Sequence, residues 1–470
     1  MSKRKKPVEL TSVTVTDYAA EGKGLARVDG KVIFVSGAIP GDAVDLFLTK
    51  NKKDWAEARV TRMVSPSPDR LTPFCAHFGT CGGCKWQMLP YEKQLQYKEQ
   101  EATENLRRIG KITEVPVLPI LGCAETTAYR NKLEFTFSNK RYITREEINA
   151  GVSVEPENAL GYHAPRIFDK VIDIDTCYLM DPVNNRIRNK IREWATERAF
   201  TFYDIKAHTG WLRNLFIRYT TNGELMVNLC IQHEDEANRT WLLDQLLKEI
   251  PEISTLLYTI NPKWNDSIYD LNPIVYHGNG YVTERLGDFQ FKISPKSFFQ
   301  TNTFQAKRLY DVVADFAQLS GTETLYDLYC GTGSIGIYLS RGARKLIGVE
   351  VIPEAIEDAK QNAALNQINH AEFFAGDVIH ICNDAFFETH GRPDIIITDP
   401  PRAGMHEKLL QKLLNMEAPK IVYVSCNTAT QARDLALLSE KYRVEKLQPV
   451  DMFPHTHHIE SVALLRLNNQ

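Results

Sequence analysis

A cysteine near the end of the chain stands where a nucleophile could act. Cys426 falls between an apolar strand pattern, Lys420–Ser425, and a helical pattern further on, Thr430–Lys441. A helix N-terminus lowers the pKa of a nearby thiol from its free value of about 8.5 and favours the reactive thiolate. A buried structural cysteine is the alternative interpretation. The position at a strand end favours a catalytic thiolate.

Four acidic residues could receive a cationic ligand. Asp327, Glu350, Asp377 and Asp399 each fall at the expected carboxyl end of a strand. Like charges disfavour an anionic pyrophosphate, whereas S-adenosylmethionine carries a sulfonium and no phosphate. The alternative for each acid is a helix cap, because Asp accepts backbone N–H groups at helix starts. The set as a whole favours S-adenosylmethionine.

A glycine-rich turn would seat the adenosine part of such a ligand. Gly331, Gly333 and Gly336 have the spacing of dinucleotide-binding turns, and Glu350 follows Gly331 by nineteen residues. Glu350 could therefore accept hydrogen bonds from ribose hydroxyls. The same glycine spacing occurs in NAD-dependent oxidoreductases, which the acidic residues disfavour.

A thiolate next to a methyl donor has a specific use. Adding sulfur to C6 of uracil makes C5 enolate-like, so that C5 can attack a methyl group. The adduct must then lose its C5 proton to a base before the thiolate leaves. The segment Phe453–Ser461 offers Glu460 as this base, with His458 as a rival. Arg402 stands after Asp399-Pro400-Pro401, where enzymes that methylate exocyclic amines commonly place an aromatic residue, and this argues against amine methylation.

Four further cysteines have the spacing of a metal site. Cys75, Cys81 and Cys84 form a close group, and Cys177 is a plausible fourth ligand. Four thiolates favour an iron–sulfur cluster or a structural zinc ion. Spacing alone does not separate these two, and His77 is an alternative zinc ligand.

Strands and helices must alternate to position the catalytic candidates. From about residue 291 the expected strands are Glu323–Tyr329, Lys345–Glu350, Ala371–Ala375, Asp394–Thr398, Lys420–Ser425 and Ser461–Leu467. Repeated strand–helix units predict a parallel sheet covered on both faces, with ligands bound beyond the carboxyl ends of its strands. The active-site candidates follow those ends.

The rest of the chain divides into two further regions. Residues 1–70 carry thirteen Lys and Arg against nine Asp and Glu, and their short alternating runs predict a small five-stranded β-barrel. Four of these basic residues lie in Lys3–Lys6, which could equally be a solvated disordered tail. Residues 127–290 predict a mixed sheet with helices over Asp181–Phe200 and Glu236–Ile250. We therefore expect domains at 1–64, 65–290 and 291–470.

Composition limits the classes of protein. The 470 residues have a formal net charge of −3, so nucleic acid would have to bind to local patches. No run of eighteen apolar residues and no secretory signal is present, and we expect a cytoplasmic protein without a membrane partner.

The motifs together resemble those of the RNA uracil-C5 methyltransferase family. The resemblance rests on Phe299–Asn302, Asp327–Gly333, Asp399–Gly404, Ser425–Asn427 and His455–Glu460, and extends over essentially the whole chain. It implies a multidomain fold with an N-terminal OB-like β-barrel of the TRAM type, a central α+β domain and a C-terminal α/β Rossmann-like class I methyltransferase domain.

The resemblance also implies roles for single residues. By it, Gln300, Tyr329, Glu350 and Asp399 contact S-adenosylmethionine, Cys426 is the nucleophile and Glu460 the proton acceptor. The RlmD-like branch of the family carries a [4Fe-4S] cluster on an arrangement similar to Cys75, Cys81, Cys84 and Cys177, with structural zinc as the alternative here.

We therefore expect methylation of a uridine in 23S ribosomal RNA, with transfer RNA as the alternative substrate. The target base must leave its stack, and Phe298, Phe299 or Tyr329 could stack on it or on adenine, although each could equally be a core residue. A catalytically inactive RNA-binding ribosome assembly factor is the alternative from another class. No obligate protein partner is expected.

Overall fold

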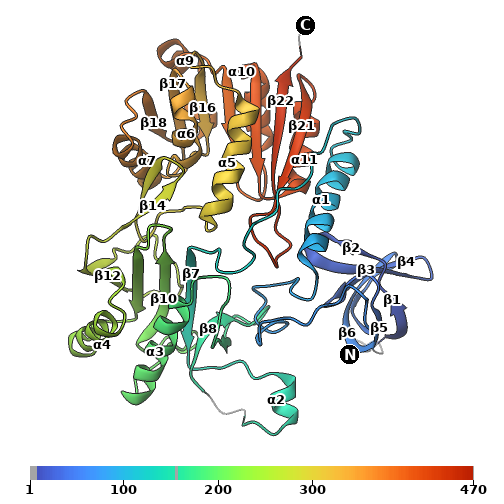
Figure 1. The fold of residues 1–470 in the computed structure, drawn as a ribbon, viewed down its shortest axis with the longest axis vertical. Coiled ribbons are helices and arrows are strands. Elements are labelled where there is room, and N and C mark those ends of the chain that lie inside the picture. Colours follow the sequence, from blue (N-terminus) through green and yellow to red (C-terminus); the bar gives the residue numbers. More distant parts are fainter. Residues whose placement is uncertain (1–7, 154–156, 469–470) are drawn as a thin grey trace, which may run out of the picture.

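The computed structural model describes residues 8–153 and 157–468, so the run Lys3–Lys6 lies outside the described residues. The molecule has three parts, with the N-terminal barrel and the central sheet on either side of one end of the C-terminal sheet (Figure 1). Within the described residues, no helix is long and apolar enough to cross a membrane.

The N-terminal part is a barrel-like sheet of six strands in the order β1-β5-β6-β4-β3-β2. The strands are β1 (Glu9–Thr14), β2 (Asp17–Ala19), β3 (Lys23–Val28), β4 (Lys31–Ser36), β5 (Ala43–Asn51) and β6 (Trp55–Ser65), with a short 3-10 turn η1 (Ala20–Gly22). Alternate side chains such as Ile33, Val35, Val44 and Leu46 are buried inside, as a strand period of two requires. The prediction of five strands was wrong, because the run from Ser12 to Asp17 bends and contributes to two strands.

The central part is a mixed sheet of seven strands in the order β13-β12-β11-β10-β7-β8-β9. These are β7 (Lys132–Ser138), β8 (Ala159–His163), β9 (Val171–Asp173), β10 (Leu212–Tyr219), β11 (Leu225–Ile231), β12 (Ile253–Ile260) and β13 (Ile274–His277). Its helices are α2 (Arg145–Asn149), α3 (Val183–Glu197) and α4 (Glu236–Glu249). The predicted helices over Asp181–Phe200 and Glu236–Ile250 are confirmed as α3 and α4. A hairpin, β14 (Val282–Leu286) and β15 (Phe289–Ile293), follows.

The C-terminal part is a doubly wound sheet in the order β18-β17-β16-β19-β20-β22-β21. Its strands are β16 (Thr324–Leu328), β17 (Lys345–Glu350), β18 (Ala371–Ala375), β19 (Ile395–Thr398), β20 (Lys420–Ser425), β21 (Tyr442–Val450) and β22 (Glu460–Leu467). The helices are α5 (Thr303–Ala317), α6 (Ser334–Leu339), α7 (Pro353–Leu365), α8 (Val378–Ile381), α9 (Asp384–His390), α10 (Glu407–Met416) and α11 (Thr428–Leu438), with the 3-10 turn η2 (Ser340–Gly342). Apolar cores fill both faces of the sheet.

Two details of this sheet differ from the prediction. The sequence analysis missed β21, and β22 runs antiparallel between β20 and β21. The start of β22 therefore lies at the edge where the parallel strands end. An antiparallel strand needs no crossover helix, so its hairpin with β21 leaves no strand–helix alternation in the sequence.

A long helix joins the parts. The sequence has a helical pattern from Tyr91 to Ile109, and the structure forms helix α1 (Tyr91–Arg108) there. Ala102 and Leu106 of α1 are buried in the core of the C-terminal sheet, and the segment after α1 adds bridges from Val117 and Leu121 to β21. Helix α1 thus lies beside α11 and the edge strand β21 (Figure 1).

Candidate active site

The glycine turn after β16 is closed by Glu350. One carboxylate oxygen of Glu350 accepts the N–H of Gly331 at 3.2 Å, and the other accepts the N–H of Ile352 at 3.1 Å. Gly331 and Gly333 have φ angles of 53° and 77°, a region that favours glycine. A carboxylate has about four acceptor positions, so Glu350 keeps capacity for hydroxyl donors of a ligand.

Two of the four acids predicted at strand ends have structural partners. Asp377 caps α8 by accepting the N–H of Ile379 at 2.8 Å, which is the helix-cap alternative. Asp327 accepts the N–H of Gly336 at 2.8 Å and so fixes the start of α6. Its other oxygen is buried without a hydrogen-bond partner among the described residues. Burial, together with Asp399 and Glu350, raises the pKa of Asp327 to about 7. This orphaned oxygen marks a place where a cation or donor group would be stabilising.

The other predicted donor-site residues, Gln300 and Tyr329, come from the segment before α5 and from the turn after β16. The carbonyl of Gln300 accepts Nδ2 of Asn131 at 2.9 Å, which ties the segment before α5 to the central sheet. Tyr329 directly follows β16 with a φ angle of 62° and is half-buried. Left-handed backbone at a residue other than glycine is strained and clusters at functional sites. Phe298 is 68% exposed, whereas Phe299 is buried in the core, so Phe299 is not a stacking platform.

Cys426 and Glu460 are brought together by the reversed strand. Ser425, the last residue of β20, pairs with Ser461 of β22, so the next residue on one strand and the preceding residue on the other are neighbours at the sheet edge. Asn427 caps α11 by accepting the N–H groups of Ala429 and Thr430. The thiol therefore stands at the start of α11, as the sequence predicted.

The prediction that the pKa of Cys426 would be lowered was wrong for the protein without ligands. Burial, followed by the negative charges of Glu460 and Asp399, raises the pKa of Cys426 to about 11. The Arg402 guanidinium, which hydrogen-bonds the sulfur, opposes this shift. The helix N-terminus is thus outweighed by burial and by two acids that stand 27 and 34 residues away in the linear sequence.

Those two carboxyl groups are themselves forced toward their neutral forms. Burial raises the pKa of Asp399 to about 7. Burial and the nearby Asp399 raise the pKa of Glu460 well above its usual range, with Arg402 opposing. Two like charges in one buried site cannot both ionise easily, so the pair holds a proton next to the thiol.

His458 contacts Arg402 and not a carboxylate. Burial, His457 and Arg402 lower the pKa of His458 to about 3. The backbone of Arg402 is in turn fixed to the start of α11, because its carbonyl accepts Asn427 Nδ2 and Thr430 Oγ1 at 3.1 Å and 3.2 Å. From the sequence, Arg402 was noted only because it stands where an aromatic residue would indicate amine methylation. Its place as the cation beside the thiol was not predicted.

The four predicted metal-ligand cysteines line one cavity. A cavity of about 180 Å3 is bordered by Cys75, Cys81, Cys84 and Cys177, and by His77. Burial and, less strongly, the neighbouring thiols raise the pKa of Cys81 to about 11 and that of Cys84 to about 12. A bound metal cation would lower these thiol pKa values, because cysteines bind metals as deprotonated thiolates.

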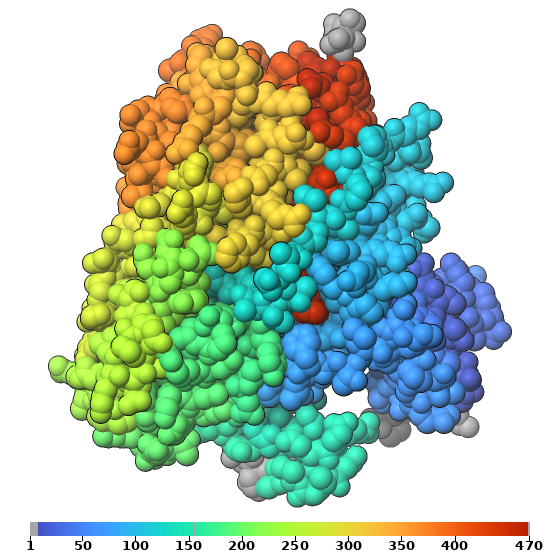
Figure 2. Space-filling model, in the orientation of Figure 1, coloured from blue at the N-terminus to red at the C-terminus, as the bar shows by residue number. Residues whose placement is uncertain are grey.

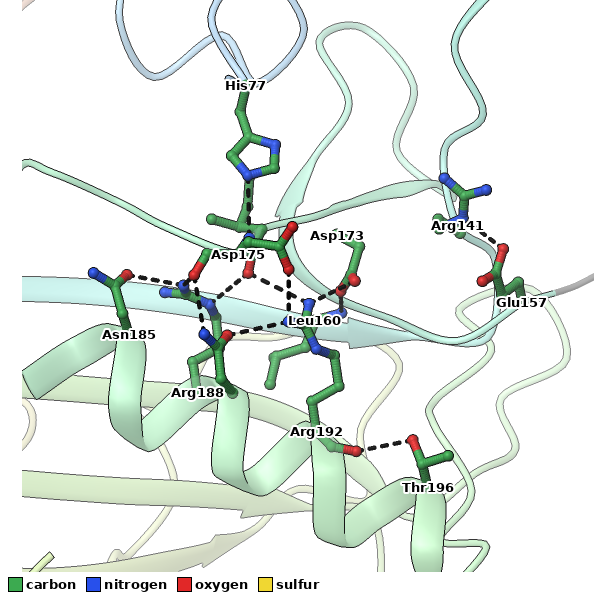
Figure 3. A network of polar contacts seen from close by, with 12 residues as sticks. His77, Arg141, Glu157, Leu160, Asp173, Asp175, Asn185, Arg188, Arg192 and Thr196 are labelled. Atoms are coloured by element: carbon green, nitrogen blue, oxygen red, sulfur yellow. Dashed lines mark hydrogen bonds and ion pairs between the residues drawn. The ribbon is translucent and has the colours of Figure 1, made fainter. Parts of the chain in front are cut away.

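A polar network brings Cys177 to the other cysteines. Figure 3 shows Nε2 of His77 accepting the N–H of Asp175, at 3.1 Å, and Arg188 donating to the same segment. Asn185 Oδ1 accepts the N–H of Cys177 at 2.8 Å. Because Nε2 of His77 is engaged, this nitrogen serves as a structural acceptor and not as a metal ligand.

The donor set suits a soft metal group, since thiolates select zinc or iron–sulfur clusters. All nine cysteines are free. Within residues 8–153 and 157–468, however, no group of three or more His, Cys, Asp or Glu side chains is arranged to hold a metal ion. The four thiols share a cavity with room for a group of several atoms, but a metal centre is not shown.

The fold and the site define the class of protein first. A doubly wound sheet with a glycine turn after its first strand and an acid at the end of the second is the architecture of a Rossmann-like, S-adenosylmethionine-dependent methyltransferase. Residues 274–468 match the family model described as tRNA (Uracil-5-)-methyltransferase, and residues 4–61 match that of the TRAM domain.

Whole-chain relatives narrow the class. The chain is 52% identical over 453 residues to an uncharacterized RNA methyltransferase of Bacteroides thetaiotaomicron, covering 96% of this chain and 100% of the relative. It is 48% identical to another from Porphyromonas gingivalis, with 97% and 100% covered. A crystal structure of Pyrococcus abyssi tRNA (uracil-54, C5)-methyltransferase in complex with S-adenosyl-L-homocysteine is similar, with a TM-score of 0.73, 28% identity, and 96% and 99% covered. The chain belongs to the RNA uracil-5 methyltransferase family.

Proposed function

We propose that this protein methylates C5 of a specific uridine in 23S ribosomal RNA through a covalent bond between Cys426 and C6 of the base. The observation that carries the proposal is the pairing of Ser425 with Ser461, which sets a thiol and a buried carboxyl group side by side at the ligand-binding edge of the sheet. Nucleophile and base at neighbouring positions are what C5 methylation requires.

Four residues would hold the methyl donor. Gln300 and Tyr329 flank the sheet edge, and Glu350 and Asp399 supply carboxylates at the ends of β17 and β19. S-adenosylmethionine, when bound, supplies an electrophilic methyl group on a sulfonium. The positive charge would favour ionised Asp399 and relieve the unpartnered oxygen of Asp327.

Cys426 would begin the reaction by adding to C6 of the uracil. Its proton must first pass to solvent, and the guanidinium of Arg402 stabilises the thiolate that remains. Addition shifts the C5–C6 electron pair onto C5 and O4, and C5 then forms its bond to the methyl group as the methyl–sulfonium bond breaks.

Glu460 would end the reaction. Its carboxylate takes the proton from C5, the C5–C6 double bond re-forms, and the thiolate leaves. Burial raises the pKa of Glu460, which makes its ionised form a stronger base than an exposed glutamate. His458 is a weaker candidate, because a pKa near 3 describes a poor proton acceptor.

RNA binding would be divided between the parts. The barrel of residues 1–64 would hold phosphates, while the C-terminal domain takes a base that has left its stack. We place this activity in the cytoplasm. Transfer RNA is the second candidate substrate, favoured by the similarity to the Pyrococcus abyssi enzyme, whose match over 96% of this chain means that domain content does not separate the two.

Cys75, Cys81, Cys84 and Cys177 would hold a [4Fe-4S] cluster, with structural zinc as the alternative. The support is the donor set around one cavity and the free state of all four thiols. Methylation needs no electron transfer, so we assign this group a structural role.

The deciding experiment maps 5-methyluridine by mass spectrometry in 23S ribosomal RNA and transfer RNA from cells with and without the gene. Loss of one or more methyl groups from 23S ribosomal RNA supports the proposal, and loss from transfer RNA alone transfers it to the second candidate. An unchanged methylation pattern, together with purified protein that methylates neither RNA, would instead favour the inactive assembly factor.

A further inference from the structure

The loop between β21 and β22, residues 451–459, leads directly into Glu460. It extends from the sheet edge toward the beginning of α1 (Figure 1). His455 within it has a φ angle of 64° and is buried. On the face drawn in Figure 2, only small red patches of the C-terminal segment show between the yellow and the cyan-to-blue atoms. A buried loop with strained backbone keeps its shape only if its surroundings hold it.

One face of α1 holds this loop through polar contacts. Tyr91, Gln94 and Lys98 are spaced three and four residues apart and therefore share a face of the helix. The hydroxyl of Tyr91 donates to Oδ2 of Asp451 at 2.8 Å. Lys98 Nζ donates to Oδ1 of Asp451 at 2.7 Å, and both of these charged side chains are fully buried. The start of the loop is thus fixed by a buried ion pair.

Gln94 joins the middle of the loop to the segment Cys84–Leu89, which we call the cysteine segment. Its Oε1 accepts the N–H of His455 at 2.8 Å, and its Nε2 lies 3.2 Å from Nδ1 of the same residue. The same Nε2 donates to the carbonyls of Trp86 and Leu89, at 3.0 Å and 2.9 Å. Gln94 is completely buried. One amide side chain therefore contacts both segments.

The cysteine segment also contacts the loop directly. The N–H groups of Lys85 and Trp86, which follow Cys84, donate to the carbonyl of His455 at 2.7 Å and 3.1 Å. Tyr129 donates its hydroxyl to the carbonyl of Pro454 at 3.0 Å. Because two backbone N–H groups donate to the carbonyl of His455, both the position and the orientation of this carbonyl are fixed.

We propose that Gln94 is a positioning residue for proton removal, which holds loop 451–459 against the Cys84–Trp86 segment and so sets the place of the Glu460 carboxyl group. This rests on the proposed function, in which Glu460 is the base. A buried polar network fixes one arrangement where an apolar contact would allow several, because each donor and acceptor must be satisfied. A displacement of about 1 Å at a reacting group can reduce a rate by about 100-fold.

The same contacts link the cysteine site to the active site. Cys84 is one residue from the first of the two N–H donors to His455. A group bound by the cysteines would keep this turn in place and thereby the loop. We expect loss of that group to loosen residues 451–459.

The test compares Gln94→Met with the matched control Asn261→Leu. Methionine keeps the volume of Gln94 and removes its four polar contacts. Asn261 is also a completely buried amide, but its side chain contacts the backbone of Lys263 and Asn265 in the central part, away from the loop. Two measurements are made on each purified full-length variant: hydrogen exchange of residues 451–459, and the fraction of RNA covalently bound on a denaturing gel.

Gln94→Met should exchange faster in residues 451–459, lower kcat by about 100-fold, leave KM for RNA within about twofold, and accumulate the covalent adduct. Asn261→Leu should do none of these at equal thermal stability. Adduct accumulation distinguishes a misplaced base from general destabilisation, which lowers the amount of active protein and traps no intermediate. Unchanged exchange in Gln94→Met overturns the proposal, and so does the absence of adduct in Gln94→Met when Glu460→Gln accumulates it.

Failure of the proposed chemistry would look different. Gln94→Met could loosen the loop while even Glu460→Gln never forms an adduct. That result would support the role of Gln94 in holding the loop and contradict the covalent mechanism. Cys84→Ser completes the experiment: increased exchange in residues 451–459 supports the link from the cysteine site, and unchanged exchange overturns that link.

Discussion

Nη2 of Arg402 lies 3.2 Å from Nδ1 of His458. Since a guanidinium only donates hydrogen bonds, His458 must present an unprotonated Nδ1 to it. The contact keeps the imidazole neutral and directs it at Arg402, on the side of the site where the Cys426 thiol is also found. His458 therefore helps to position the cation, which agrees with Glu460 as the proton acceptor of the proposed reaction.

Replacing Cys426 with alanine should abolish methylation and spare binding of S-adenosylmethionine. The thiol is needed only to activate the base, and the donor contacts lie on other strands. Incorporation of labelled methyl into RNA and calorimetry of donor binding check the two halves. Cys230→Ala, a buried cysteine of the central sheet, is the control. Methylation that persists in Cys426→Ala contradicts the nucleophile role.

Replacing Glu460 with glutamine should trap the covalent RNA adduct. Glutamine keeps the shape of the side chain and cannot take the C5 proton, so the reaction stops before the thiolate leaves. A shifted protein band on a denaturing gel, lost after nuclease treatment, reports the adduct. His458→Asn should retain turnover within about tenfold. An adduct that accumulates in His458→Asn and not in Glu460→Gln would exchange the two roles.

The reactivity of the Cys426 thiol should rise steadily with pH. A thiol pKa raised to about 11 means that the thiolate fraction grows about tenfold per pH unit through the neutral range and levels off only near that pKa. Alkylation of the Cys426 peptide by iodoacetamide, followed by mass spectrometry of ligand-free protein, measures this profile. A plateau below pH 9 would refute the raised pKa.

Arg402 should shift the alkylation profile of Cys426 to lower pH. Its guanidinium stabilises the thiolate, so Arg402→Leu should move the rise to higher pH and slow alkylation several-fold at pH 8. Arg443→Leu, which removes an exposed arginine paired with Glu445, should leave the profile unchanged. Faster alkylation in Arg402→Leu would contradict the assignment.

Anaerobic purification should give a brown protein with iron and sulfide in equal amounts. Cys81→Ser, which removes one of the four thiols on the cavity, should lose the colour, whereas Cys382→Ser, in a different core, should keep it. A colourless protein with stoichiometric zinc would replace the cluster with the zinc alternative.

Much of the architecture could be predicted from local patterns. The strands β16 to β20 and the helices α1, α3 and α4 follow from apolar periodicity, because a strand or helix must bury one repeating set of side chains. The glycine turn and the position of Cys426 before α11 follow from the same short-range rules. The four cysteines predicted as ligands, Cys75, Cys81, Cys84 and Cys177, line one cavity, and the metal group they would bind stays a prediction.

Long-range geometry decided the rest. The antiparallel insertion of β22 places Glu460 beside Cys426. Burial of the thiol, together with Glu460 and Asp399, reverses the expected shift of its pKa. Of the four acids at strand ends, Asp327 and Asp377 turn out to fix helix starts. Gln94 and Lys98 belong to a helical stretch whose mixed Lys, Arg, Glu and Gln face predicts only a connector near the barrel, and both are completely buried. Sequence periodicity reports which residues share a face, but burial and charge depend on which distant segment covers that face, and only the folded chain determines that.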